Sequence, residues 1–171
     1  IPGIYAIIDD YIQKMKTKAP YVSLTHRHYF SPFIIGIKNF ALVLSPKLID
    51  VLNTGEKEVL IQHELSHIKR NDNLIGWIAL ILRDLLFFNP FSYIAYSLIK
   101  SEQEKDSDKL VVKYSGKPVK KIAKNILNAT LKIKSISTLP DFSFDISSAA
   151  FMVSSNTLLL MNLLGLEGRS V

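Results

Sequence analysis

The chain has 171 residues, 48% of them hydrophobic, and its 21 Lys and Arg exceed its 15 Asp and Glu to give a net charge of +6. This length predicts one compact domain over residues 1–171. The absence of cysteine excludes a disulfide scaffold, a thiolate metal site and a cysteine nucleophile, so any metal must be held by carboxylates and by the four histidines, His26, His28, His63 and His67.

The first third of the chain predicts a helix followed by a small sheet. Apolar residues recur at helical spacing as far as Met15, which predicts an amphipathic helix that stops near Pro20. Segments rich in aromatic and β-branched residues then predict three strands, at 21–25, 33–37 and 40–45, with Lys38-Asn39 as a tight turn between the last two. We expect residues 1–54 to form this helix and a small, mostly antiparallel sheet.

Start and stop signals divide the following residues into helices. Ser45-Pro46 predicts a short helix that reaches about residue 52. Asn53, with Glu56 three residues later, is the signature of a capping box and opens a longer helix that runs to about Asn71.

The second half of the chain predicts further helices. We expect Asp72 to cap a helix that ends near residue 88, and Asn89-Pro90 to close it and begin another that reaches residue 112 or 113. Residues 55–113 thus form one group of helices. Residues 114–171 form a second group, with helices at 118–134 and 147–164 and a loop at 135–146.

The apolar stretch 74–99 is long enough to span a bilayer. Arg83 and Asp84 interrupt it, and charges in the middle of a span cost roughly 2.5–3.5 kcal/mol each, so we predict two packed helices instead. The chain begins with Ile rather than Met, which is compatible with a fragment of a longer protein whose flanking transmembrane helices were removed.

The positive charge is concentrated between Lys109 and Lys134, where eight lysines occur without an acidic residue. The favoured interpretation is the solvated face of an ordinary helix, and the alternative is a surface that attracts an anionic membrane. The segment lacks a recognition motif for DNA or RNA, so we do not expect nucleic acid as a partner.

The motif that points to chemistry is His63-Glu64-Leu65-Ser66-His67. Residues four apart on a helix lie one above the other, so His63 and His67 can chelate one metal ion, with Glu64 at the edge of the same face. The competing interpretation is a pair of satisfied core histidines. Ile61, Leu65 and Ile68 form an apolar stripe on nearly the opposite side of the helix. This stripe can anchor the helix in the core while the histidines face a cleft, which favours metal binding.

A third protein ligand must be a histidine or a carboxylate, because a catalytic zinc site usually has three protein ligands and one open position. The acidic segment 102–108 offers two pairs with helical spacing, Glu104 with Asp108 and Glu102 with Asp106. In each pair the Glu can bind the metal while the Asp orients a ligating histidine. Periodicity alone leaves both pairs open.

Taken together, these residues resemble the gluzincin metallopeptidases. The resemblance is closest to the peptidase domain of the bacterial β-lactam-sensing signal transducers (BlaR/MecR type), and more distant to the HtpX and Ste24-type membrane peptidases and the minigluzincins. It is carried by the S-P-F-I-I-G-I run at 31–37, the strand at 41–44, H-E-L-S-H-I-K-R-N-D at 63–72, F-F-N-P-F at 87–91 and the Glu102-x-Glu104-x-x-x-Asp108 pattern.

The resemblance implies an α+β, zincin-like fold whose small sheet packs on the active-site helix, with a mainly helical C-terminal half. It implies that His63, His67 and Glu104 bind Zn2+. It also implies that Asp108 orients a ligating histidine, with Ser107 standing where the family often has Cys.

The activity implied is a zinc-dependent endopeptidase that hydrolyses peptide bonds of a protein or peptide substrate. Glu64 is then the general base on zinc-bound water. We expect residues 40–45 to be an edge strand that binds an extended substrate by backbone pairing, through Ala41, Leu42, Val43 and Leu44.

The residue that stabilises the oxyanion is not assigned by any motif, and the candidates are Tyr114, His26, His28 and Arg83. The alternative function is therefore a signalling or scaffold module that zinc stabilises, with latent or absent proteolysis. The family resemblance implies a location on the cytoplasmic side of a membrane if the chain is part of a longer protein, and otherwise in the cytoplasm.

Overall fold

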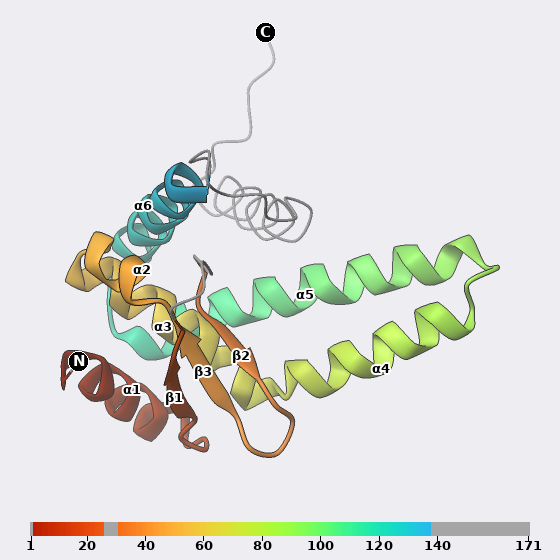
Figure 1. Cartoon of the computed structure of the whole chain (residues 1–171), viewed down its shortest axis with the longest axis horizontal. Coiled ribbons are helices and arrows are strands. Elements are labelled where there is room, and N and C mark those ends of the chain that lie inside the picture. The colour runs from red at the N-terminus through yellow and green to blue at the C-terminus, as the bar shows by residue number, and fades with distance from the viewer. Residues whose placement is uncertain (1, 26–30, 138–171) are drawn as a thin grey trace, which may run out of the picture.

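The computed structural model of the chain describes residues 2–25 and 31–137 (Figure 1). His26, His28, most of the expected loop at 135–146 and the expected helix at 147–164 lie outside these residues. In chain order the elements are α1 (Pro2–Met15), β1 (Tyr21–Leu24), β2 (Phe33–Ile35), β3 (Ala41–Leu44), α2 (Pro46–Val51), α3 (Thr54–Arg70), α4 (Asp72–Leu85), α5 (Pro90–Ser115) and α6 (Val119–Ser137).

The three strands form a mixed sheet in the order β1-β3-β2. β2 and β3 are antiparallel, as expected, and Phe33 lies opposite Val43. β1 and β3 are parallel, with Tyr21 opposite Ala41. The α+β class is confirmed, but one of the two strand pairs is parallel, so the sheet is not mostly antiparallel.

The expectation that β3 is an edge strand is wrong. β3 is central, because β1 pairs along one side of it and β2 along the other. The backbone groups of Ala41, Leu42, Val43 and Leu44 therefore face neighbouring strands of the same sheet. β3 follows both of its partners along the chain but lies between them in the sheet.

The loop that joins β2 to β3 depends on Gly36. Its φ of +98° lies in the region that favours glycine. A Cβ atom at this position would lie 2.1 Å from the carbonyl oxygen of Asn39, so a side chain does not fit. The loop spans residues 36–40 and depends on glycine geometry, so it is longer than the tight turn expected at Lys38-Asn39.

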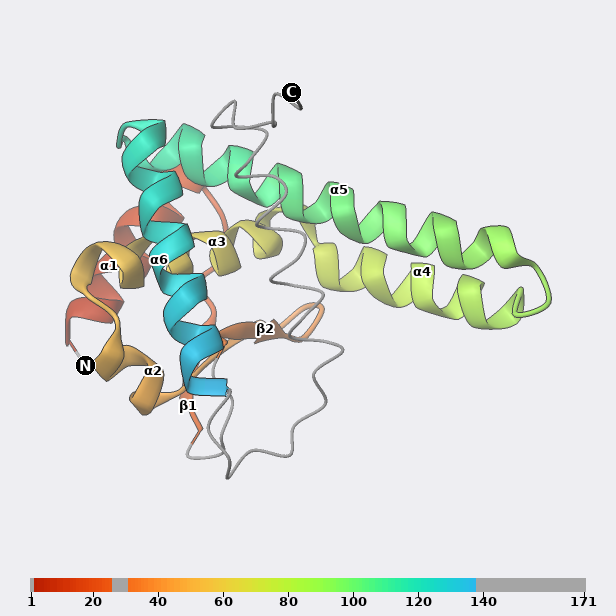
Figure 2. The same ribbon diagram turned by 90° about the horizontal axis from the view of Figure 1, so that it is seen from above.

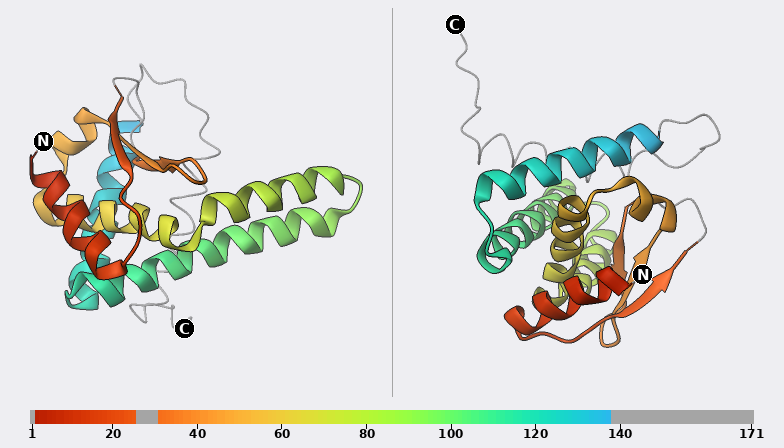
Figure 3. Two further views of the ribbon diagram at one scale, coloured as in Figure 1. Left: turned by 90° about the horizontal axis from the view of Figure 1, so that it is seen from below. Right: turned by 90° about the vertical axis from the view of Figure 1, so that its left-hand side faces the viewer.

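The main core lies where α1, the sheet and α3 meet. Its members are buried apolar side chains from all three, among them Ile8, Met15, Leu42, Leu44, Ile61, Leu65 and Ile68. The predicted apolar stripe of α3 is therefore confirmed as its core face. A smaller cluster joins α3 to α5 and α6, around Val59, Val111 and Ile122. Figure 3 (right) shows α3 between α6 and the layer of α1 and the sheet.

The start of α3 is fixed by the predicted capping box. The Asn53 side chain accepts a hydrogen bond from the Glu56 amide, and the Glu56 carboxylate accepts one from the Asn53 amide, each at 2.9 Å. Glu56 also pairs with Lys132 of α6 at 2.7 Å. Because one carboxylate serves both contacts, the cap of the site-bearing helix is linked to the packing of α6.

Part of the charge on the lysine-rich segment is neutralised within the described chain. Three of its lysines form ion pairs, Lys109 with Asp106, Lys117 with Glu58 and Lys132 with Glu56. Two of these pairs reach α3, so the lysines hold the C-terminal half of the described chain against the site-bearing helix.

Helices α4 and α5 form a hairpin that extends away from the rest of the described chain, with its turn at the far end (Figures 1 and 2). The prediction that residues 74–99 form two packed helices is confirmed. Within residues 2–25 and 31–137, no helix combines the length and the apolar character that crossing a membrane requires.

Candidate metal centre

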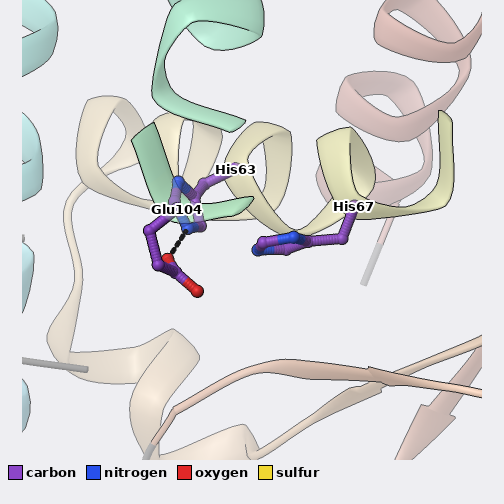
Figure 4. Close-up of side chains that lie close together, drawn as sticks. All are labelled: His63, His67 and Glu104. Carbon is purple, nitrogen blue, oxygen red and sulfur yellow. Dashed lines mark hydrogen bonds and ion pairs between the residues drawn. The ribbon is translucent and has the colours of Figure 1, made fainter. Parts of the chain in front are cut away.

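His63 and His67 lie one turn apart on α3 and meet Glu104 of α5, as Figure 4 shows. One ligand atom from each of these three residues lies within 4.8 Å of the other two. The two imidazole rings are 5.1 Å apart between their centres and nearly perpendicular. α3 and α5 thus bring two nitrogen donors and one oxygen donor to a common point, as expected from the sequence.

The His63 ring is held between two carboxylates of α5. Its Nδ1 lies 2.9 Å from the Asp108 carboxylate, and its Nε2 lies 3.2 Å from the Glu104 carboxylate. Burial lowers the pKa of His63, but the hydrogen bonds and negative charges of Asp108 and Glu104 outweigh it and raise this pKa well above its usual value. Without a metal, this setting favours the protonated imidazolium, whose two N–H groups can donate to the two carboxylates.

The His67 ring is held by the turn between α3 and α4. Its Nδ1 lies 2.8 Å from the Asp72 carboxylate and 3.1 Å from the Ser107 hydroxyl. A carboxylate can only accept, so Nδ1 donates its proton to Asp72. This fixes the tautomer and leaves Nε2 as a free donor of an electron pair to a metal.

Asp72 does not cap α4, contrary to the expectation. The cap position belongs to Asn71, whose φ of +54° and ψ of +38° turn the chain at the junction of the helices. That turn brings the Asp72 carboxylate back to His67 and to the Arg70 guanidinium, whose Nε lies 3.1 Å away. Asp72 directly follows the histidine helix, a position that suits both a helix cap and a histidine partner, so the sequence alone did not reveal this contact.

The structure separates the two carboxylate pairs that the sequence left open. Glu104 and Asp108 both contact His63. Glu102 instead pairs with Lys105 at the exposed surface, at 2.7 Å. Asp106 pairs with Arg70 and Lys109, and these cations lower its pKa to about 2.

Glu64 is buried beside the three ligand candidates. Burial raises the pKa of its carboxyl group, the positive charges of His67 and His63 oppose this, and the negative charge of Glu104 adds to it. Its carboxylate is therefore a stronger proton acceptor than that of an exposed glutamate. Burial also raises the pKa of the Glu104 carboxyl, but the hydrogen bond and charge of His63 outweigh it and lower this pKa.

These residues fit a zinc ion. Two neutral imidazoles and one carboxylate are the three ligand candidates that the described residues bring together, and such a trio is a donor set of the kind found in catalytic zinc sites, which keep a fourth position open. Both histidines present Nε2 to the centre because a carboxylate of another element occupies Nδ1, Asp108 for His63 and Asp72 for His67. The Asp72 carboxylate and the Ser107 hydroxyl were not assigned to the site from the sequence.

Two candidates for the oxyanion donor have partners elsewhere. The Tyr114 hydroxyl accepts a hydrogen bond from Lys69, and its ring packs edge-on against Tyr11. Arg83 pairs with Asp84 in the α4–α5 hairpin. Both groups therefore have partners other than the ligand candidates, while His26 and His28 lie outside the described residues.

Comparison with known proteins places this centre inside a matched region. A protein-family profile described as BlaR1 peptidase M56 matches residues 3–143. The methicillin resistance mecR1 protein of Staphylococcus aureus is 30% identical over 83 residues, which are 48% of this chain and 14% of that protein. The regulatory protein BlaR1 of Bacillus licheniformis is 32% identical over 83 residues, again 48% of this chain and 14% of that protein.

A second group of relatives carries a protease name. The protease HtpX homolog of Thermococcus kodakarensis is 35% identical over 80 residues, which are 46% of this chain and 28% of that protein. The chain thus corresponds to less than a third of the length of each of these three relatives.

Proposed function

The chain belongs to the BlaR1 peptidase M56 family, and from this premise we propose that it is a zinc-dependent endopeptidase domain with Glu64 as the general base. His63, His67 and Glu104 are the proposed ligands. The substrate class is a protein or peptide, and the domain works as part of a membrane-associated peptidase.

When bound, zinc lowers the pKa of a coordinated water towards 7 and polarises the carbonyl of the scissile bond. The rest of the chemistry falls to the chain. Asp108 and Asp72 hold the two imidazoles in the tautomer that binds metal. Glu64 takes a proton from the attacking water at its carboxylate and gives it to the nitrogen of the leaving amine.

The observation that carries the proposal is the convergence of His63, His67 and Glu104, whose ligand atoms lie within 4.8 Å of one another beside a buried Glu64. Structural zinc sites are usually closed by four protein ligands. Among residues 2–25 and 31–137, three protein donors meet beside an acid, and this arrangement supports a catalytic role instead.

The test is to replace Glu64 by Gln, which keeps the size and burial of the side chain but removes its basicity. We expect hydrolysis of a peptide library by the zinc-loaded chain to fall at least about 100-fold. Zinc content should remain one ion per chain, measured by elemental analysis. Equal cleavage by the Glu64→Gln chain would refute Glu64 as the base.

The alternative is a signalling or scaffold module in which zinc only stabilises the fold. It is favoured by the engagement of Tyr114 and Arg83 elsewhere, which leaves the oxyanion donor unassigned among the described residues. A zinc-loaded, folded chain that cleaves no member of the library would support this alternative.

A further inference from the structure

The α4–α5 hairpin exposes most of its large apolar side chains. On α4 the exposed residues are Leu74, Ile75, Trp77, Ile78, Ile81, Leu82 and Leu85, and on α5 they include Phe91, Ile94 and Leu98. At the tip, Phe87 is 70% exposed, and Phe88 and Phe91 are each 72% exposed. Water-soluble helices turn such residues towards a core, so an apolar surface of this extent requires a partner.

The face between the two helices has the opposite character. Gly76 and Ala79 are the buried residues of α4 along it, and a Cβ on Gly76 would lie 2.8 Å from the Lys100 ammonium nitrogen. The Arg83 guanidinium lies over the Tyr96 ring, 4.8 Å from its centre. Small and polar residues therefore line the inside of the hairpin. Apart from Asp84, whose side chain is 60% exposed, large apolar residues dominate its outside, which is the reverse of a helix pair in water.

This inversion identifies the kind of partner. A docked protein covers one face of a hairpin, but here the outer faces of both helices and the tip are apolar. Helix pairs in lipid pack through small residues and turn polar groups towards each other. We propose that the α4–α5 hairpin inserts into the hydrocarbon of a lipid bilayer.

The distribution of charge fits this partner. Arg83 and Asp84 are the only charged residues between Asp72 and Lys100, and they pair with each other at 2.6 Å. The hairpin thus carries no net charge into the lipid. Arg83 also has the rings of Tyr93 and Tyr96 beside it, which shields the guanidinium within the helix pair.

The length of the hairpin fixes how it enters. α4 has 14 residues and is therefore about 21 Å long, which is less than the roughly 30 Å of a bilayer's hydrocarbon core. The hairpin enters from one side and returns to it. Glu104 lies 14 positions beyond Pro90 on α5, so the metal centre is held about 21 Å from the tip, near the membrane surface.

The chain provides its own probe for this insertion, because Trp77 is its one tryptophan and is 57% exposed on α4. We expect red-shifted Trp77 emission in lipid-free solution. Vesicles of phosphatidylcholine, which carry no net charge, should shift the emission to the blue. Lipids brominated on their acyl chains should quench it, and both effects should persist at high salt.

The matched variants test the tip directly. Replacing both Phe87 and Phe88 by Ser should lower the partition coefficient into these vesicles at least about tenfold, measured by flotation. Tyr21 on β1 is 74% exposed, and Tyr21→Ser removes an equally exposed aromatic ring outside the hairpin without changing partitioning. Circular dichroism of each variant checks that it is folded.

Several results would overturn the proposal. Unchanged Trp77 emission with vesicles, or equal partitioning of the tip and Tyr21 variants, would show that the hairpin does not insert. Binding that needs anionic lipid and is lost in salt would assign membrane contact to the lysine-rich segment instead. Blue-shifted Trp77 emission before lipid is added would show that protein already covers the apolar surface of the hairpin. The covering protein is a second copy of the chain if the emission depends on protein concentration, and another part of the same chain if it does not. Peptidase activity enters none of these readouts.

Discussion

Asp72 is not one of the proposed metal ligands, but its contact with His67 shows how a neighbouring residue can control a metal site. The Nδ1 of His67 lies within hydrogen-bond distance of both Asp72 and Ser107. Asp72 is the stronger partner because its charge favours a proton on Nδ1 and raises the electron density at Nε2. The turn at Asn71 positions this carboxylate. The left-handed backbone conformation of one residue therefore influences how strongly His67 can bind a metal.

Asp72→Asn should therefore weaken zinc binding about 10- to 100-fold, because the amide keeps the shape of the side chain but loses its charge. Competition with a chromogenic chelator measures this affinity. Asp106→Asn is the matched control, since Asp106 also pairs with Arg70 but contacts neither histidine. Equal zinc affinity of the two variants would contradict the role of Asp72.

At the scale of elements, α3 carries the motif and depends on its first turn for its position. The Asn53 and Glu56 side chains satisfy amides that the helix leaves without partners. Ser45 precedes α2 in the corresponding position, but its side chain makes no capping hydrogen bond. The starts of α2 and α3 therefore look alike in sequence, but only the cap of α3 contributes a side-chain hydrogen bond to the stability of its helix.

Asn53→Ala is expected to lower the free energy of unfolding by about 1 kcal/mol, since it removes the acceptor for the Glu56 amide. Ser45→Ala should change it by less than about 0.5 kcal/mol. Urea denaturation followed by circular dichroism compares the two. A loss of equal size in both variants would mean that the capping box adds nothing to stability.

At the scale of the whole molecule, a metal at this centre would cross-link α3 to α5, which are connected along the chain through α4. A proton and zinc compete for His63, because the carboxylates of Asp108 and Glu104 raise its pKa. In the metal-free protein this raised pKa contributes stability that is full below the unfolded value of about 6.5 and is lost as pH rises through the folded pKa.

Zinc should therefore stabilise the fold more as pH rises. We expect the difference in melting temperature between zinc-loaded and EDTA-treated protein to grow with pH through the pKa of His63, measured by scanning calorimetry. Glu104→Gln should remove most of this difference. Glu102→Gln should leave it intact, because Glu102 pairs with Lys105 at the surface. The opposite ranking of these two variants would assign the third ligand to Glu102.

The sequence by itself determined the features that depend on local periodicity. The spacing of His63 and His67 placed them on one face of α3, and the stripe of Ile61, Leu65 and Ile68 placed the opposite face in the core. Capping and proline signals gave the helix starts at Asn53 and Asn89 for the same reason. Such signals act within one or two turns of backbone, where the chain has few conformations to choose from.

Only the tertiary structure decided contacts between residues far apart in the chain. Periodicity treated Glu102 and Glu104 alike, and the packing of α5 on α3 turned Glu104 to His63. The central place of β3, the return of Asp72 to His67 and the apolar outside of the α4–α5 hairpin were hidden in the same way. Hydrophobic pattern shows that a face is apolar, but whether core or solvent meets that face depends on where the rest of the chain lies.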